Sequence, residues 1–226
     1  MKVLAFDTSS KAMSVALLED CQLLAEHTLN VKKNHSISLM PVIDFMMKQV
    51  GWKPTDLERI VVAQGPGSYT GLRVAVATAK TLAYTLAIDL VGVSSLHALC
   101  PERSGLLVPI IDARRNNVYA GFYDNGRATQ PDCHINFSDL LAMLKGHEKV
   151  VFVGEVEAFR NQIEEVLPQA QIQPTLPSAA LIGKLGQKLK PVVAHAFVPE
   201  YLKKVEAEEN WLKTNLETNA DYIKRV

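Results

Sequence analysis

Residues 60–83 read IVVAQGPGSYTGLRVAVATAKTLA, and this stretch decides the fold. Its first four residues are apolar and suit a buried strand. A Gly-Pro-Gly turn then ends the strand, because neither a strand nor a helix continues through these residues without cost. Ser68 and Thr70 stand where a helix N-terminus is capped, and residues 71–87 are rich in alanine. The stretch therefore predicts a strand, a tight glycine turn and a helix, as in α/β proteins.

This turn has two interpretations. Backbone N–H groups at the positive end of a helix suit an anion or the closely approaching backbone of a partner. Yet the turn is not a P-loop, because no Gly-Lys-Ser/Thr follows it, and it is not a dinucleotide fingerprint. Glycine turns without a ligand are also common between a strand and a helix. Both interpretations stay open, and the candidate ligand-binding residues are Gly65, Gly67, Ser68 and Gly71.

Composition limits the classes of protein that the chain can belong to. Of its 226 residues 48% are hydrophobic and 21% charged, which predicts a globular protein with a sizeable core. The 24 basic and 24 acidic residues cancel, which argues against strong nucleic-acid binding by the chain alone. Three widely spaced cysteines favour a reduced, cytoplasmic protein. No apolar run has membrane-spanning length, so we expect no membrane partner.

The chain begins with an apolar strand at residues 3–6 that ends at Asp7. Further strands are predicted at 13–18 and 23–29, and their short polar turns favour antiparallel hairpins. An aspartate at the end of a buried first strand is well placed to meet a ligand or a metal ion. The alternative is an Asx-turn, in which Asp7 binds its own backbone.

The second half repeats this pattern. After a boundary at residues 101–105, an apolar strand at 106–111 ends at Asp112, and a polar turn leads into a strand at 118–123. We interpret this as a weak internal duplication. Helices are predicted at 138–144, 156–167 and 178–189, with a strand at 150–153. The expected domains are an N-terminal lobe of residues 1–104, a smaller lobe of residues 105–204 and a charged helix or tail of residues 205–226.

Two predicted helices, residues 36–50 and 70–87, have apolar surfaces wider than one core needs. Pro41 favours a first helix that begins at Leu39, behind Ser38 as its cap. An apolar stripe of this kind is more often core than a partner surface. The hypothesis of a partner interface nevertheless rests on the following residues of the two helices: Leu39, Ile43, Met46, Met47, Arg73, Val76, Ala77, Lys80 and Tyr84.

Four segments resemble one known family. They are VLAFDTS at 3–9, QGPGSYTGLRV at 64–74, IDARRNNVY at 111–119 and PEYLK at 199–203. The last is similar to a P-x-Y-L-R motif, with Lys203 in place of arginine. Together they resemble the TsaB family, also called YeaZ, over nearly the whole chain. This family belongs to the tRNA threonylcarbamoyladenosine biosynthesis system and has often been labelled an M22 glycoprotease homologue.

The resemblance implies a fold and a function. The fold is the α/β, actin-like, ribonuclease-H-like ATPase (ASKHA) fold with two related lobes. The implied function is that of a non-catalytic, scaffolding and activating subunit in the synthesis of N6-threonylcarbamoyladenosine (t6A) at adenosine 37 of tRNA. The implied partners are the catalytic paralogue TsaD, which holds a metal with an H-x-x-x-H pair, and the ATPase TsaE. The chain would meet tRNA only through this complex, and alone it could form a homodimer.

The chain departs from the catalytic paralogue at the histidine pair. The positions of that pair fall at about Ser95 and Leu99 in this chain, and a serine and a leucine cannot replace two imidazoles as metal ligands. His97 lies between them but has no second histidine four residues away. We therefore expect no catalytic residues and no metal.

The loops at Asp7 and Asp112 lack the glycines that wrap a triphosphate, and Lys11 stands in the first loop. We expect no tightly bound nucleotide, although weak ATP or ADP binding in the complex stays open. The alternatives are an M22-like glycopeptidase or weak ATPase, and a tRNA-binding module that uses Arg73, Arg114 and Arg115.

Overall fold

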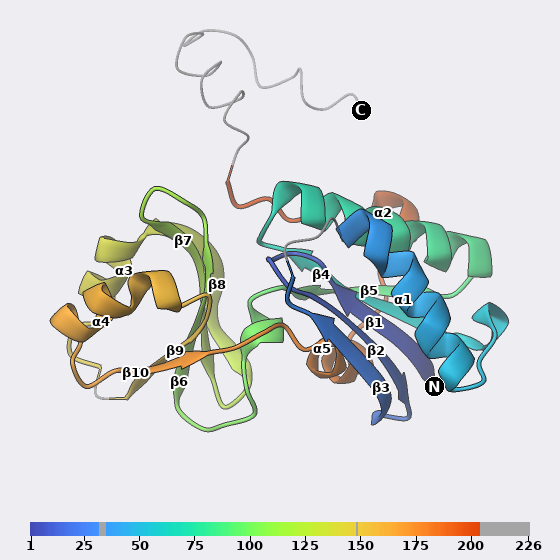
Figure 1. Cartoon of the computed structure of the whole chain (residues 1–226), viewed down its shortest axis with the longest axis horizontal. Helices are drawn as coiled ribbons and strands as arrows, with labels where there is room; N and C mark the ends of the chain where they lie inside the picture. The colour runs from blue at the N-terminus through green and yellow to red at the C-terminus, as the bar shows by residue number, and fades with distance from the viewer. Residues whose placement is uncertain (32–34, 148, 204–226) are drawn as a thin grey trace, which may run out of the picture.

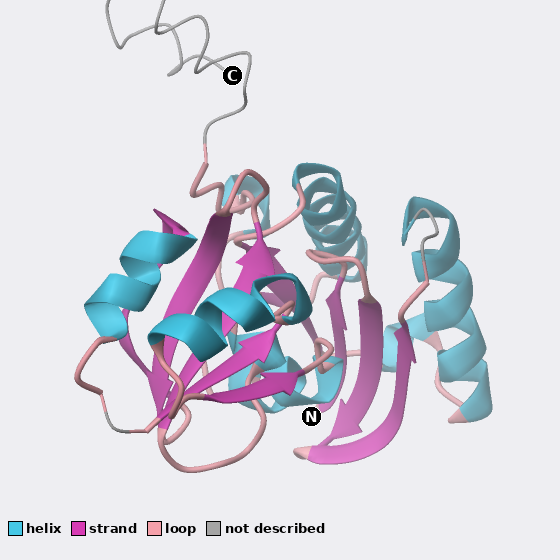
Figure 2. Ribbon diagram, turned by 60° about the vertical axis from the view of Figure 1, so that its left-hand side comes forward, coloured by secondary structure: helices cyan, strands magenta, loops and turns pink. Residues whose placement is uncertain are grey.

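The chain folds into two lobes, each built on one five-stranded sheet (Figures 1 and 2). The computed structural model describes residues 1–31, 35–147 and 149–203. The expected tail of residues 205–226 lies outside this part of the chain. Within it, no helix is long and apolar enough to cross a membrane.

The first sheet has the strand order β3-β2-β1-β4-β5. β1 pairs antiparallel with β2 and parallel with β4, and β2 pairs antiparallel with β3, which confirms the predicted hairpins. The elements of this region are β1 (Lys2–Asp7), β2 (Met13–Glu19), β3 (Gln22–Leu29), α1 (His35–Gln49), η1 (Pro54–Asp56), β4 (Arg59–Gly65), α2 (Tyr69–Leu86), β5 (Asp89–Ser94) and η2 (His97–Leu99).

The second sheet repeats the first. Counted from β8, its strand order is β8-β7-β6-β9-β10, which corresponds position by position to β3-β2-β1-β4-β5 of the first sheet. β6 pairs antiparallel with β7 and parallel with β9, as β1 does with β2 and β4, so the internal duplication is confirmed. The elements are β6 (Leu106–Asp112), β7 (Asn117–Asp124), β8 (Arg127–Asn136), α3 (Phe137–Leu144), β9 (Val150–Gly154), η3 (Glu157–Phe159), α4 (Arg160–Val166) and β10 (Gln171–Pro174).

Helices cover both faces of the first sheet. α1 and α2 lie side by side on one face, and α5 (Ala179–Gly186) lies on the other (Figure 1). Small residues let α5 approach the strands closely, since a Cβ on Gly183 would lie 2.5 Å from Leu18 Cδ1. α5 therefore packs on β1 and β2 of the first lobe, although the sequence analysis assigned residues 105–204 to the second lobe.

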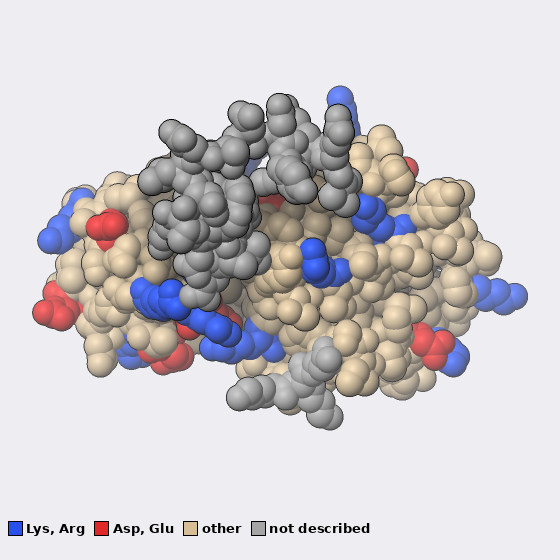
Figure 3. All heavy atoms as spheres, turned by 90° about the horizontal axis from the view of Figure 1, so that it is seen from above, with Lys and Arg blue, Asp and Glu red and all other residues tan. Residues whose placement is uncertain are grey.

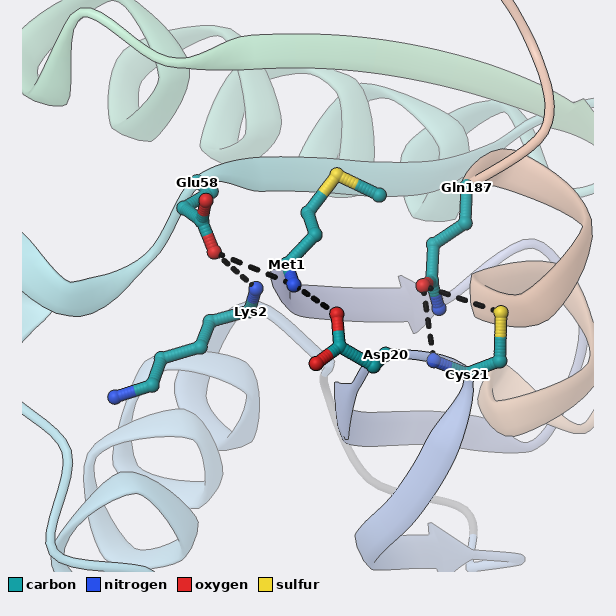
Figure 4. Close-up of polar contacts among 6 residues, drawn as sticks. All are labelled: Met1, Lys2, Asp20, Cys21, Glu58 and Gln187. Atoms are coloured by element: carbon teal, nitrogen blue, oxygen red, sulfur yellow. Dashed lines mark hydrogen bonds and ion pairs between the residues drawn. The ribbon is translucent and has the colours of Figure 1, made fainter.

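Polar contacts at the base of the first lobe join the same elements (Figure 4). Gln187 follows α5 directly. Its Oε1 accepts the backbone N–H of Cys21, in the turn after β2, at 3.0 Å. The amino group of Met1 binds the carboxylate of Asp20 and lies 3.7 Å from Glu58 Oε2. The end of α5 is thus hydrogen-bonded to the edge hairpin of the first sheet.

α1 begins at His35, one residue before the predicted helix of residues 36–50. It does not start at Leu39, the position that Pro41 favoured, so Pro41 lies inside the helix. Proline leaves the carbonyl group of residue 37 without its helical donor. Both Ile37 and Pro41 are exposed, so water can hydrate that carbonyl, and the helix continues through the proline.

Residues 191–203, here called the C-terminal strap, return along the first lobe. Val192 forms a β-bridge with Leu90 of β5, and η4 (Ala194–Ala196) packs against α2. Phe197 enters the core of the first lobe, and Glu200 donates its N–H to the carbonyl of Gln64 at 2.8 Å. The strap carries the chain back to the glycine turn after β4.

Candidate functional site

Two aspartates occupy equivalent positions at the ends of β1 and β6. Asp7 Oδ1 accepts the N–H of Ser9 at 2.6 Å, and Asp112 Oδ1 accepts the N–H of Arg114 at 2.8 Å. The Asx-turn that was one interpretation of Asp7 is therefore confirmed, and the second lobe has the same turn. Each turn leaves one carboxylate oxygen available for another contact.

The two aspartates differ in burial. Asp7 is fully buried, and no hydrogen-bond partner of its Oδ2 is present among the described residues. Burial raises the pKa of Asp7 to about 6, against the opposing effects of the hydrogen bond from the Ser9 backbone N–H and the charge of His35. Asp112 is only partly buried. The fold thus holds one carboxyl group in a buried position that penalises its ionised form.

The glycine turn after β4 packs against the turn that follows β1. A Cβ on Gly67 would lie 2.3 Å from the carbonyl oxygen of Ser9, and one on Gly71 would lie 2.0 Å from that of Thr8. Ser68 donates its N–H to the carbonyl of Ser9 at 2.6 Å. These glycines allow a close approach by the chain's own backbone, whereas the sequence suggested an anion or the backbone of a partner.

Ser68 also caps α2, as predicted, because its Oγ accepts the N–H of Gly71 at 3.3 Å. Thr8 Oγ1 donates to the carbonyl of Gly71 at 2.7 Å from the other side. Gly65 is covered by the strap, since a Cβ there would lie 2.3 Å from the carbonyl oxygen of Glu200. The N–H groups of Ser68 and Gly71 are thus already used within the chain.

A cleft of about 490 Å³ lies between the lobes, at the ends of β1 and β6. Among the candidate nucleotide residues it brings together Gly67, Ser68 and Asp112, whereas Asp7, Gly65 and Gly71 do not line it. Its other lining residues are Ser9, Ser10, Lys11, Tyr69, Thr70, Ile111, Ala113, Arg114, Tyr119, Glu155 and Lys203. The cleft therefore combines both aspartate turns, the start of α2 and the end of the strap.

Glu155 also lines this cleft, although no sequence pattern singled it out. Glu155 Oε2 accepts the N–H of Asp112 at 3.0 Å. Glu155 follows β9 in the second sheet, as Pro66 follows β4 in the first, so it occupies the duplicated counterpart of the glycine turn. Extending the duplication to this strand end would have identified it.

Ser95 and Leu99, the positions compared with the paralogue's histidine pair in the sequence analysis, lie two residues before η2 and at its last residue. Ser95 is buried, and Leu99 belongs to an apolar cluster between the lobes. His97 stacks on Tyr123 with 4.5 Å between ring centroids, and burial lowers its pKa. No cluster of three or more His, Cys, Asp or Glu side chains suited to a metal ion is present in the described ranges.

A second polar cluster, also missed, joins the lobes nearby. Ser94 at the end of β5 donates its hydroxyl to Asp132 of β8, and Tyr123 OH lies 3.4 Å from Asp132 Oδ1. Burial raises the pKa of Asp132. Because Ser94 and Asp132 belong to different sheets, this cluster connects the two lobes.

The residues expected at a partner interface have three different environments. Five of them form the core under α1 and α2 and present almost no surface: Leu39, Ile43, Met46, Met47 and Val76. Their assignment to a surface is corrected for this reason. Arg73 and Lys80 contact other parts of the chain, because Arg73 covers the Tyr69 ring at 4.5 Å and Lys80 donates to the His195 carbonyl at 3.0 Å. Ala77 and Tyr84 are exposed.

The surface of α1 and α2 carries other apolar residues. Ile37 is 72% exposed, Phe45 58% and Tyr84 80%, and Met40 is also exposed. Together with Ala77, these residues define what we call the outer helical face. In the sequence, the signal for this face was an apolar surface wider than one core needs, and Ile37 and Phe45 of α1 supply part of that excess.

Comparisons with known proteins agree over most of the chain. A family model for TsaD, described as tRNA N6-adenosine threonylcarbamoyltransferase, matches residues 22–211. The tRNA threonylcarbamoyladenosine biosynthesis protein TsaB of Bacillus subtilis is 39% identical over 95% of this chain and 99% of that protein.

Solved structures give the same result. YeaZ from Pseudomonas aeruginosa has a TM-score of 0.76 at 25% identity, over 89% of this chain and 99% of that chain. The activator of 2-hydroxyisocaproyl-CoA dehydratase from Clostridium difficile, solved with bound ADPNP, has a TM-score of 0.52 at 13% identity. It covers 85% of this chain and 100% of its own, and it supports the fold alone. The two repeated lobes have the expected ASKHA fold.

Proposed function

The chain belongs to the TsaB family, also called YeaZ, and on that premise we propose that it is the non-catalytic, scaffolding and activating subunit for t6A synthesis on tRNA. Its work is to bind the catalytic paralogue TsaD. The observation that carries the proposal is the outer helical face, where Ile37, Phe45 and Tyr84 are each more than half exposed. Large exposed apolar side chains on two neighbouring helices are typical of a protein–protein interface.

The matching family model has the name of the catalytic transferase, so the name alone does not distinguish a catalytic subunit from an accessory one. Ser95 and Leu99 stand at the positions of the paralogue's metal-binding histidines, and neither side chain is a metal ligand of that kind. This supports an accessory role for the chain, with catalysis left to the paralogue. An M22-like glycopeptidase or an ATPase would need a ligand set or a phosphate cradle of its own.

We also propose that the chain holds no nucleotide tightly and that ATP or ADP binds weakly in the complex. The close contact of Gly67 and Gly71 with the Thr8–Ser9 backbone supports this proposal, because the N–H groups of Ser68 and Gly71 already have acceptors. TsaE is the expected third subunit, and tRNA is met within the assembly. Three free cysteines support a cytoplasmic location.

The outer helical face makes the proposal testable. The double variant Phe45→Glu/Tyr84→Glu places two charges on it and should weaken binding to TsaD at least a hundredfold, since burying unpaired charges in an interface costs several kcal/mol. Both side chains are exposed, so the fold and the thermal midpoint should be kept. A variant at Met46 would not serve, because that side chain is only 3% exposed. Met143→Glu, on the exposed side of α3 in the second lobe, is the matched control.

The activity assay supplies tRNA and threonylcarbamoyl-adenylate to TsaD with and without this chain. We expect product only when both proteins are present, and loss of product with the double variant but not with Met143→Glu. Product formed by this chain alone would make it the enzyme and overturn the proposal. Unchanged TsaD affinity of the double variant would refute the outer helical face as the interface. If that face also forms a homodimer, the same variant should be monomeric by light scattering.

A further inference from the structure

Three cationic side chains from separate parts of the chain line the cleft between the lobes. Lys11 belongs to the turn after β1, Arg114 to the turn after β6, and Lys203 ends the C-terminal strap. Viewed from above, Lys and Arg side chains gather across the boundary of the two lobes (Figure 3). Only the fold brings these three residues together, since they are far apart in the sequence.

The charges of these cations are not compensated by ion pairs within residues 1–31, 35–147 and 149–203. Two carboxylates, Asp112 and Glu155, also line the cleft. Each of them has one oxygen that accepts a backbone N–H, at 2.8 Å and 3.0 Å respectively. The three cations therefore exceed the acidic groups by one charge in this cleft.

Hydroxyl groups add hydrogen-bond donors between the cations. Ser9 lines the cleft but is fully buried, and its Oγ has no hydrogen-bond partner in the described part of the chain. Ser10 and Thr70 lie beside it, and the positive end of α2 begins at Tyr69.

The turn that carries Arg114 is held in an unusual conformation. Arg114, Arg115 and Asn116 have φ values of 67°, 53° and 57°, the left-handed region that side chains with a Cβ rarely adopt. The side chain of Asn117 binds the carbonyl groups of Arg114 at 3.3 Å and Arg115 at 2.9 Å and so supports this turn. Strain of this kind persists where a turn must present particular side chains.

From these observations we propose that the mouth of the cleft, with Lys11, Arg114 and Lys203, binds the phosphodiester backbone of an RNA strand, the tRNA of the assembled complex. A phosphodiester group carries one negative charge, and such groups are spaced along a strand, which suits separate cations on an open rim. A triphosphate would instead concentrate its charge beside Asp112 and Glu155. The inference rests on the proposed function. Because the chain has no net charge, we expect this contact with RNA only within the assembled complex.

The test measures tRNA affinity of the complex of this chain with TsaD over a range of salt concentrations. The triple variant Lys11→Ala/Arg114→Ala/Lys203→Ala should bind tRNA at least tenfold more weakly at low salt. The slope of log affinity against log salt should fall by about 0.7 to 0.9 for each phosphate group that the variant no longer binds. The control Lys53→Ala/Arg127→Ala/Lys145→Ala removes the same charge from exposed positions outside the cleft and should stay within about twofold of the wild type. Lys11→Arg/Lys203→Arg keeps the charges and should keep tRNA affinity.

Light scattering on every variant separates the two proposals. If the heterodimer forms and product depends on this chain, but the triple variant binds tRNA as the control does, this inference is wrong and the proposed function stands. If the wild-type chain does not join TsaD, the proposed function fails and the inference falls with it. A third arm uses ATP with Mg²⁺ as the probe. If the triple variant loses ATP binding and keeps tRNA affinity, the cations serve a nucleotide and the RNA assignment is overturned.

Discussion

Replacing Asp7 by asparagine should make the folded protein more stable at neutral pH. Asp7 is fully buried, and its Oδ2 has no hydrogen-bond partner among the described residues. Burial raises its pKa from an ordinary value of 3.8 to about 6, which means that the fold disfavours the ionised form. Asparagine keeps an oxygen that can accept the N–H of Ser9, and it removes the buried charge.

The magnitude follows from proton linkage. Above pH 6 the carboxyl group is ionised in both states, and holding it in the fold costs about 3 kcal/mol. Between pH 6 and pH 4 the folded state takes up the proton before the unfolded chain does, so the free energy of unfolding rises as the pH falls. Part of the gain is lost because the new amide N–H groups also lack an acceptor. We expect Asp7→Asn to gain about 1 to 3 kcal/mol at pH 7.5.

Denaturant unfolding of both proteins at several pH values measures this effect. The difference between Asp7→Asn and the wild type should be largest at pH 7.5 and should shrink as the pH falls through 6. Other carboxyl groups contribute equally to both proteins and cancel in this difference. Asp112→Asn makes the same exchange in a partly buried turn and should change stability by less than about 1 kcal/mol. A difference of zero or below at pH 7.5, or one that stays constant down to pH 4, would refute the reasoning.

Two further predictions concern packing and thiol chemistry. Gly71→Ala places a Cβ 2.0 Å from the carbonyl oxygen of Thr8 and should cost about 3 kcal/mol or more of stability, or prevent folding; denaturant unfolding measures this loss. Gly183→Ala is the control, because its nearest neighbour is a leucine methyl group that can move, and it should cost clearly less. In a labelling assay with a thiol reagent at pH 8, exposed Cys21 should react quickly, whereas Cys100 should react only after unfolding, because burial raises its pKa to about 12. Equal labelling rates for the two cysteines would contradict this prediction.

The sequence predicted the fold well where one signal repeats. Both lobes begin with a buried strand that ends in an aspartate, and both sheets then follow the same strand order. β8 and β10 were not predicted, because Arg127–Asn136 and Gln171–Pro174 are largely polar edge strands without an apolar alternation. They form because a neighbouring strand supplies the hydrogen bonds, and a single-sequence pattern does not record that neighbour.

The candidate interface shows a second limit of prediction from the sequence. Helical periodicity selects the most regular apolar stripe of α1, and such a stripe faces the core, as Leu39, Ile43 and Met46 do. Residues that meet a partner need only be apolar and outward, as Ile37 and Phe45 are, and their spacing has no separate signature. α5 was also assigned to the wrong lobe. It was assigned by its place in the chain after residue 105, and that place does not show which sheet the helix packs on.

The glycine turn after β4 lies at the start of α2, the helix that links the cleft to the outer helical face. A glycine pattern before a helix predicts room beside the backbone, and the sequence alone does not say what occupies the room. Here the backbone of Thr8 and Ser9 occupies it, so the glycines hold the two turns of the first lobe together. The surfaces that we propose for partners are the rim of the cleft, where the cations lie, and the outer side of α1 and α2. These two surfaces share α2, which begins at the cleft and exposes Tyr84 three turns or more further on. A partner bound to the outer helical face would therefore leave the cleft mouth accessible, and a single rigid helix would fix the position of RNA relative to the catalytic subunit.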